Sequence, residues 1–156
     1  MNIVGEHVRR PEAAVVARVI AWLDAVPYAL LALPLRLAVA TVFWNSAMAK
    51  LANFDTALAL FADEYKLPLL PPDLAAHLAL SIELVTPLLL VVGLFTRVAA
   101  LVLLGMTAVI EIFVYPQAWP THLQWAAMLL ILLCRGAGRW SADAWLRRRF
   151  GPAAAA

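Results

Sequence analysis

The sequence is short of charge and of cysteine, and each shortage argues against a class of protein. Charged residues make up 14% of the 156 residues, and the mean hydropathy is +0.86. Soluble domains carry roughly 25% charged residues, so this composition favours an integral membrane protein. The single cysteine, Cys134, excludes disulfide exchange within one chain and a cysteine-rich zinc or iron–sulfur site.

Several functional motifs are also missing. The chain has no phosphate-binding glycine loop, no GxSxG sequence and no basic–aromatic surface of the kind that binds nucleic acid. His77 and His122 lie in different segments, without HxxxH or HxxE spacing. A metal site needs three or four converging ligands. We therefore predict neither a metal site nor a nucleic-acid partner.

What the sequence does contain is long apolar stretches, near residues 28–48, 74–95, 98–115 and 122–133. About 20 apolar residues cross a bilayer as a helix, so the last stretch is short unless it continues to residue 138. The stretches do not alternate between apolar and polar residues, which argues against a membrane β-barrel. The sequence predicts an all-α integral membrane four-helix bundle over residues 28–138.

Basic residues gather in three segments: the N-terminal segment, the short connection near residue 97 and the C-terminal tail. The first long loop is acidic on balance, and the third has no basic residue. Cytoplasmic segments of membrane proteins carry the excess of lysine and arginine. We therefore expect both termini in the cytoplasm, with a basic tail over residues 139–156. The arginines concerned are Arg9, Arg10, Arg18, Arg97, Arg135, Arg139, Arg147, Arg148 and Arg149.

Residues 1–27 are expected to form a cytoplasmic or interfacial segment. Residues 12–26 resemble an amphipathic helix, with Arg18, Trp22 and Asp24 along it. Such a helix lies along the inner membrane surface. The second interpretation, which the sequence leaves open, is a cytosolic extension of the first span after a kink at Pro27.

Arg36 and Glu83 each stand alone inside an apolar stretch. An isolated charge in hydrocarbon normally faces a partner or a wet cavity. Counting helical rise from the expected span ends puts both residues at nearly the same depth, so we expect them to pair. The pair is either a structural contact that fixes helix register or part of a functional pocket.

A second polar group is expected in the outer half of the bundle. Glu111 and Tyr115 are four residues apart and share a helix face. Glu111 is either a proton-carrying carboxyl or a simply hydrogen-bonded one, and His122 opens the fourth span at the same outer side. The expected outer pocket comprises Asn45, Lys50, His77, Glu111, Tyr115, His122 and Gln124.

The C-terminal part carries helix-end signals. Gly136 and Gly138 are expected to end the fourth span. Ser141 then looks like a helix N-cap, with Asp143 in the first turn. Arg139 is placed to meet Asp143 or the connection between the second and third spans.

Three stretches resemble the DoxX family of four-helix bacterial inner-membrane proteins. They are Leu35-Arg-Leu followed by Phe43 and Ala49-Lys-Leu, then Glu83 followed by Val92-Gly-Leu-Phe-Thr-Arg-Val-Ala-Ala, and finally Gly136-Ala-Gly-Arg-Trp-Ser-Ala-Asp. One departure is that Ser46 or Ala47 stands where the family often has glycine before the lysine. The resemblance implies shared roles for Arg36, Lys50, Glu83, Arg97, Gly138, Arg139, Ser141 and Asp143.

The resemblance implies a membrane subunit beside an oxidoreductase, linked to quinone, or a redox or metal-stress system. On that hypothesis Arg36, Glu83 and His122 bind the quinone, Glu111 and Tyr115 transfer its protons, and Lys50, Arg97, Arg139, Ser141 and Asp143 are structural. The chain would hold no cofactor of its own, so a protein partner would carry one. The alternative is a non-catalytic scaffold or small-solute carrier. The substrate, the partner and the oligomeric state stay open.

Overall fold

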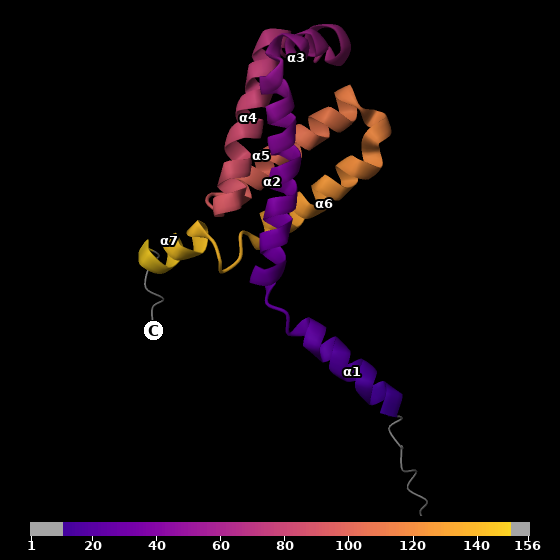
Figure 1. Ribbon diagram of the computed structural model, residues 1–156, viewed down its shortest axis with the longest axis vertical. Coiled ribbons are helices and arrows are strands. Elements are labelled where there is room, and N and C mark those ends of the chain that lie inside the picture. Colours follow the sequence, from indigo (N-terminus) through magenta and orange to yellow (C-terminus); the bar gives the residue numbers. More distant parts are fainter. Residues whose placement is uncertain (1–10, 151–156) are drawn as a thin grey trace, which may run out of the picture.

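The computed structural model describes residues 11–150, and all the regular structure in this range is helical. Four helices pack side by side: α2 (Tyr28–Ala52), α4 (Pro72–Val92), α5 (Thr96–Val109) and α6 (Trp119–Arg135). Helix α2 packs most extensively on α4, and α5 on α6 (Figure 1). Arg9 and Arg10, which the arginine pattern in the sequence assigns to the cytoplasmic side, lie outside the described residues, as do residues 151–156 of the basic tail.

Three of these helices are long and apolar enough to cross a membrane. They are α2, α4 and the continuous helical run Thr96–Val114, which includes α5. Helix α6 has 17 residues and is about 25 Å long at 1.5 Å per residue. A hydrocarbon core is about 30 Å thick, so α6 by itself is shorter than a membrane crossing, as its short apolar stretch indicated.

Alanines on α2, α4 and α5 make up much of the buried core. The buried positions of α2 follow a spacing of three and four residues, which is the period of one helix face. Small side chains let membrane helices approach closely, so packing contacts replace a hydrophobic driving force that lipid cannot supply. Larger side chains from four helices fill the centre: Phe43, Leu90, Leu103, Leu129 and Leu132.

The segment expected as a plain loop folds into short helices. Helix α3 (Phe54–Leu60) starts where the Asn53 side chain accepts the backbone N–H of Thr56. A π-helical turn, η1 (Phe61–Tyr65), follows. Phe61 packs on Ala75, Ala76 and Ala79 of α4 and so holds this segment over the end of the bundle. These elements are one or two turns long, which is too short to produce a periodic pattern in the sequence.

A second π-helical turn, η2 (Ile110–Val114), ends the third apolar run. A short 3-10 turn, η3 (Pro116–Ala118), leads into α6. The tyrosine between them, Tyr115, leaves helical geometry with φ −134° and ψ 65°. Single π turns inside α-helices occur often at functional sites, so η1 and η2 direct attention to the space between them.

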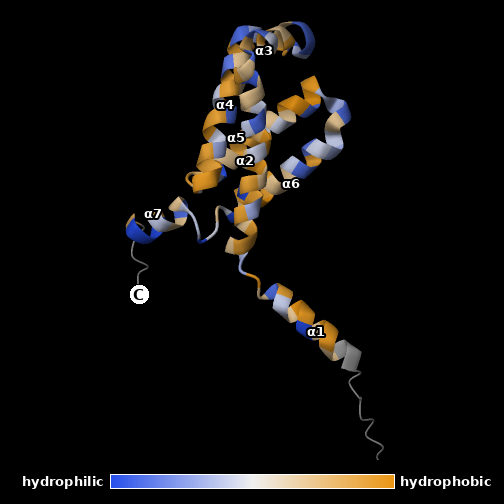
Figure 2. Cartoon of the chain, in the orientation of Figure 1, coloured by the Kyte–Doolittle hydropathy of each residue, from blue (hydrophilic) through white to orange (hydrophobic). Residues whose placement is uncertain are grey.

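The predicted N-terminal helix is present as α1 (Pro11–Asp24). It ends before Pro27, as expected, and projects away from the bundle in Figure 1. Its large apolar side chains are exposed, and Figure 2 shows the helix as mostly hydrophobic. Exposure of this kind fits either earlier interpretation of α1, because both leave the helix off the bundle.

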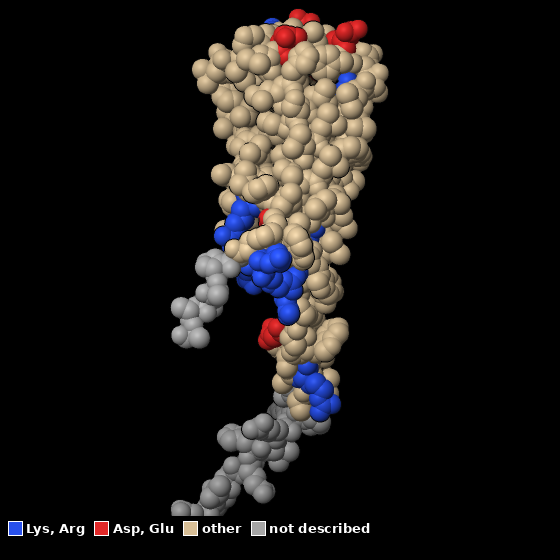
Figure 3. All heavy atoms as spheres, turned by 90° about the vertical axis from the view of Figure 1, so that its left-hand side faces the viewer, with Lys and Arg blue, Asp and Glu red and all other residues tan. Residues whose placement is uncertain are grey.

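Charge is separated between the two ends of the molecule. On the face in Figure 3, Asp and Glu side chains gather at the end that holds α3, and Lys and Arg gather at the other end. Helix α7 (Ala142–Phe150) carries Arg147, Arg148 and Arg149 at that second end. An uncharged belt separates the two groups. This is the distribution that the arginine pattern in the sequence indicated.

Candidate functional site: a cavity between the helices

Arg36 lies at the basic end of the bundle, in contact with backbone carbonyls. Its Nε donates to the carbonyl of Leu90 at 2.7 Å, and its Nη2 donates to that of Val91. Its Nη1 donates to the carbonyls of Ala137 and Trp140 at 3.2 and 2.9 Å. The guanidinium therefore fastens the C-terminus of α4 to the segment after α6. We call this region, with the α4–α5 turn and residues 136–143, the arginine end.

Asp143 and Gly93 hold residues 136–143 against the α4–α5 turn at the same end. The Asp143 carboxylate accepts the backbone N–H groups of Phe95 and Thr96 at 2.8 and 3.0 Å, and so caps α5 rather than its own helix. Gly93 has φ 72°, and a Cβ there would lie 2.6 Å from the Cβ of Ser141. Only glycine fits so close an approach with that backbone conformation.

Ser141 caps α7 as the sequence indicated, because its Oγ accepts the backbone N–H of Ala144 at 3.2 Å. Gly136 ends α6 with φ 75°, also as expected. Arg97 donates from Nη2 to the carbonyl of Cys134 at 3.2 Å. Arg139 is exposed, and no Arg139–Asp143 ion pair occurs among the described residues, where Asp143 instead binds the two backbone N–H groups.

Glu83 pairs with Lys50, so the predicted Arg36–Glu83 pair is wrong. Lys50 Nζ lies 2.9 and 2.8 Å from the two Glu83 carboxylate oxygens and donates to Ser46 Oγ at 2.9 Å. Ser46 in turn donates to Glu83 Oε1 at 3.0 Å. The Glu83 side chain is 2% exposed and that of Lys50 17%. This is a largely desolvated ion pair with a third hydrogen-bonding partner.

Helix register explains the error. Helix α2 runs to Ala52, so Lys50 lies inside the helix and not beyond its end. Arg36 is level with Leu90 and Val91, whereas Ser46 is level with Glu83. Ten residues along α2 separate the two levels, which is about 15 Å. The lysine stem is long enough to reach back along its own helix to Glu83.

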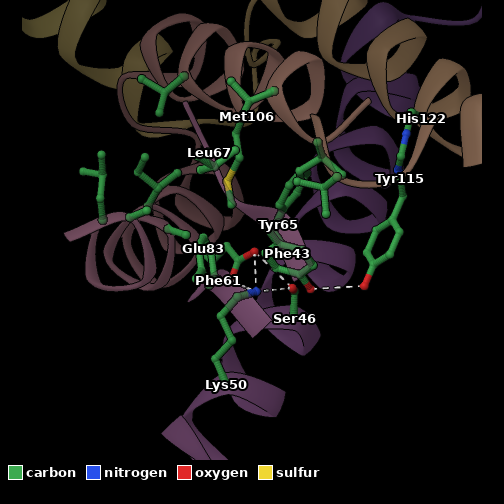
Figure 4. Close-up of a pocket in the computed structure, with 18 of the residues that line it drawn as sticks. Phe43, Ser46, Lys50, Phe61, Tyr65, Leu67, Glu83, Met106, Tyr115 and His122 are labelled. Carbon is green, nitrogen blue, oxygen red and sulfur yellow. Dashed lines mark hydrogen bonds and ion pairs between the residues drawn. The ribbon is translucent and has the colours of Figure 1, made fainter. Parts of the chain in front are cut away.

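A cavity of about 510 Å³ lies beside this pair, between α2, η1, α4, the helical run Thr96–Val114 and α6. Its wall is mostly apolar, with Phe43, Phe61, Met106 and Trp125 among its larger side chains. Figure 4 shows Lys50, Ser46, Glu83, Tyr65, Tyr115 and His122 around it. Arg36 does not line the cavity, so the helix register just described removes it from the predicted quinone-binding set of Arg36, Glu83 and His122.

His122 and Glu111 form a second polar pair at the cavity wall. His122 Nδ1 lies 2.6 Å from Glu111 Oε2, and the imidazole is buried while the carboxyl is partly exposed. His122 lines the main cavity and also a smaller one of about 300 Å³ between α5 and α6, which Glu111 lines. No other residue is common to the two linings. The imidazole therefore separates two spaces.

Tyr65 and Tyr115 bring the two π-helical turns together. Their hydroxyl oxygens are 3.2 Å apart and their rings meet edge to face at 5.6 Å. Burial raises the pKa of the half-buried Tyr65 hydroxyl above its ordinary value, and the hydrogen bond to Tyr115 raises it further. Tyr65 therefore stays protonated and neutral. Two hydroxyls that share one hydrogen bond keep one hydrogen for another acceptor.

The expected outer pocket forms only in part. Lys50, Tyr115 and His122 line the cavity, and Glu111 touches it through His122. Asn45, His77 and Gln124 are exposed and line neither cavity, because they fall on the outward faces of their helices. No cluster of three or more metal-ligating side chains occurs in the described part of the chain.

The sequence interpretation missed Ser46 and Tyr65. Ser46 was open to prediction, since it precedes Lys50 by four residues and shares its helix face. Tyr65 carried no such signal, because its position depends on how the segment after α3 folds back over the bundle. Both belong to the polar groups of the cavity.

The sequence model of the DoxX family matches residues 31–116, which is more than half of the chain. The chain belongs to the DoxX family. The matched region holds Arg36, Lys50, Glu83, Glu111 and Tyr115, and it ends before His122. This membership and the three long apolar helices make the DoxX protein a membrane protein.

A similar curated protein is an uncharacterized protein of Haemophilus influenzae. It is 30% identical over 124 residues, which cover 73% of this chain and 82% of that protein. No solved structure matches the chain. The family model therefore establishes the family of the DoxX protein, and its activity is argued from the cavity.

Proposed function

We propose that this DoxX protein is a membrane subunit of an oxidoreductase system and binds a quinone in the main cavity. The observation that carries the proposal is a mostly apolar space of about 510 Å³ with a few convergent polar groups, enclosed by membrane helices. Small-molecule sites typically measure about 300–1,000 Å³ and have this kind of lining. A quinone headgroup matches it, because its apolar ring carries hydrogen-bond acceptors at its edge.

The polar groups suit those acceptors. The Tyr65–Tyr115 pair has one hydroxyl hydrogen to donate beyond the bond that joins the two rings. The Lys50 ammonium, fixed by Ser46 and Glu83, places a positive charge in the cavity wall. The pair as a whole is neutral, so it favours a neutral, polarisable ligand over an ion. Glu83 thus acts on the ligand through Lys50.

Proton handling falls to Glu111, His122 and Tyr115. A quinone takes up two electrons and two protons on reduction to a quinol. Since Glu111 holds Nδ1 of His122, the ring's other nitrogen, Nε2, has no hydrogen-bonding partner among the described residues. A carboxylate that fixes an imidazole in this way sets its tautomer and supports proton transfer at the far nitrogen. The proton passes between the small cavity and the main one.

The electrons, on this proposal, come from a protein partner that carries the redox cofactor. The protein sits in a bacterial inner membrane and crosses it four times, with α6 as the fourth crossing and its ends extended by the flanking residues. Both termini lie in the cytoplasm. The arginine end faces inward because basic residues are retained on the cytoplasmic side. The main cavity then lies in the outer half of the bilayer.

The direct test is to purify the protein from native membranes and identify what accompanies it. We expect bound quinone in the lipid extract and a cofactor-bearing protein partner. Added decylubiquinone should quench tryptophan fluorescence, since Trp125 lines the cavity, and Trp125→Phe should remove most of that signal. Absence of both bound quinone and quenching would favour the alternative, a non-catalytic scaffold or small-solute carrier.

The proton-transfer role has its own test. In membranes that contain the partner, Glu111→Gln should slow quinone reduction by about 10²–10⁴-fold, the usual contribution of a positioned acid or base, while protein abundance is unchanged. Tyr115→Phe tests the second proposed group in the same assay. Glu64→Gln is the matched control, because this exposed carboxyl lines neither cavity. Equal rates for Glu111→Gln and wild type would remove Glu111 from the mechanism.

The proposed topology is tested by reporter fusions. Fusions at Phe61 and at the C-terminus should report opposite sides of the membrane. A fusion in the η3 turn should agree with the one at Phe61, because α4 and the run Thr96–Val114 cross the membrane twice between the two positions. A C-terminal reporter on the same side as Phe61 would show that α6 does not cross.

A further inference from the structure

The main cavity is covered at the end that holds α3. Phe61, Leu67 and Leu70, all from the segment between α3 and α4, line it there. Phe61 is buried against three alanines of α4, and Tyr65 is tied to Tyr115. An apolar cover that is packed and hydrogen-bonded in this way separates the cavity from the aqueous side of the bundle. Entry through it would require the η1 turn to lift.

The wall between α4 and α5 is different. Three side chains that line the cavity there are also exposed on the surface of the bundle: Leu78 is 46% exposed, Val102 37% and Val109 40%. A residue that both lines a cavity and reaches the surface lies at its opening. We call these three residues the side opening.

The course of the helices explains why an opening forms here. Helices α4 and α5 are joined by a three-residue turn at the arginine end and diverge from it (Figure 1). Asp143 and Arg36 hold the turn itself tightly. The gap therefore widens toward the other end of the bundle, where the cavity lies. Helix α4 and the run Thr96–Val114, which includes α5, are long and apolar enough to span a membrane, so the gap faces lipid and not water.

We infer that the ligand enters the cavity sideways from the bilayer, through the side opening between α4 and α5. The inference rests on the proposed function and adds the route and the class of ligand. That class is a neutral lipophilic molecule whose oxygen-bearing head reaches Lys50, Tyr115 and His122 while its apolar tail stays in the opening against lipid. A charged hydrophilic solute is excluded, because Leu78, Val102 and Val109 offer no group to replace its water.

The exposed ring of Tyr115 marks the other place where the cavity nears the surface. There the Tyr65 and Tyr115 rings pack edge to face and share a hydrogen bond, so they close the gap between the two π-helical turns. The side opening has no polar contact across it among the described residues. Movement of three aliphatic side chains is enough to widen it.

The test uses the full-length protein in nanodiscs of phosphatidylethanolamine and phosphatidylglycerol, with decylubiquinone as the probe and tryptophan quenching as the readout. Phenylalanine is introduced at the opening in Val109→Phe, and in Val102→Phe with Leu78→Phe. Matched controls are Val85→Phe on α4 and Val98→Phe on α5, which are exposed to lipid but do not line the cavity. None of the five positions belongs to the polar groups that bind the ligand.

We expect association and dissociation to slow together by about tenfold or more in the opening variants, with Kd changed less than about threefold, because a narrowed passage raises the barrier without altering the bound state. The control variants should match the wild type. A Val109→Ala variant, which widens the opening, should bind at least as fast as the wild type and guards against misfolding of the larger substitutions.

The outcomes separate the two proposals. Unchanged rates in the opening variants, or slow binding by Val109→Ala, would overturn the side entrance while leaving the cavity as the binding site. A wild-type protein that binds no decylubiquinone would overturn the proposed function, and the entrance with it.

Discussion

The two ends of the bundle treat buried charge in opposite ways. At the arginine end, Arg36 donates four hydrogen bonds to backbone carbonyls, and Asp143 accepts two from backbone N–H groups. Both charged groups bind backbone atoms, and these hydrogen bonds hold α4, α5 and the segment after α6 together. At the other end, Lys50, Glu83, His122 and Glu111 pair with one another around an open volume.

On the function proposed above, this difference separates the charges that hold the fold from those that serve the binding site. A lone ionisable residue in a membrane helix is a functional candidate by default. Arg36 shows that such a residue can be wholly structural, because the free carbonyls at a helix C-terminus offer partners for a cation. The other end is a candidate binding site because it contains a cavity, and not because it contains charged residues. Substitutions at the arginine end should therefore affect stability, and those at the cavity should affect binding.

The largest effect is expected at Arg36. Arg36→Leu removes four hydrogen bonds and leaves the carbonyls of Val91, Ala137 and Trp140 without this donor, so we expect a loss of about 3–5 kcal/mol in unfolding free energy, since each unsatisfied buried acceptor costs about 1–3 kcal/mol. Denaturant unfolding in detergent micelles measures it. Arg36→Lys should recover little, since an ammonium cannot reproduce the planar fork. A loss below 1 kcal/mol would show that the arginine end is not held by its charge.

The Lys50–Glu83 pair should show coupling that Arg36 and Glu83 do not. Lys50→Met leaves the buried Glu83 carboxylate without a counter-charge, and Glu83→Gln does the same to the Lys50 ammonium. Each substitution alone should therefore lower the unfolding free energy by about 3 kcal/mol, the lower part of the range for broken buried pairs. The double variant should cost much less than the sum. Measured by the same unfolding experiment, Arg36→Leu and Glu83→Gln should simply add within about 0.5 kcal/mol. Coupling between Arg36 and Glu83 would contradict the helix register described above.

A smaller effect is expected at two glycines, Gly93 in the turn between α4 and α5 and Gly105 in α5. Gly93→Ala puts a Cβ against Ser141 and strains a left-handed residue, so we expect a loss of about 1–3 kcal/mol. Gly105→Ala is the matched control, because a Cβ at Gly105 meets nothing within 4 Å and α-helix favours alanine by roughly 0.5–1 kcal/mol. Thermal unfolding should move Tm down in the first variant and up in the second. Equal shifts would mean that the arginine end has room for a Cβ at position 93, against the close approach to Ser141.

The smallest effect is a pH dependence at the cavity. The pKa of Tyr65 is raised in the folded protein above its ordinary value of 10.0, so above pH 10 the unfolded chain loses this proton first. The folded state then binds more protons than the unfolded state, and stability falls as pH rises. Tyr65→Phe should make the decline of Tm above pH 10 shallower. An unchanged slope would show that Tyr65 is not buried against Tyr115.

The sequence predicted more of the fold than of the site. The apolar stretches placed α2, α4 and the third apolar run within a few residues, and Ser141 and Gly136 marked real helix ends. The sequence also put Lys50, Tyr115 and His122 in one pocket, which is correct. It failed at Arg36 and Glu83, where a shift of about 15 Å between antiparallel helices changed the partner of each charge.

The sequence by itself determined that this is a helical membrane protein with most of its arginines at one end. Those properties depend on apolar length, on glycine and proline at helix ends, and on the order of charges along the chain, all of which are local. Only the tertiary structure decided that Glu83 binds Lys50, that Asp143 caps α5, and that Tyr65 and His122 border one cavity. Such partners depend on helix register and tilt, which are fixed by packing between segments that lie far apart in the sequence.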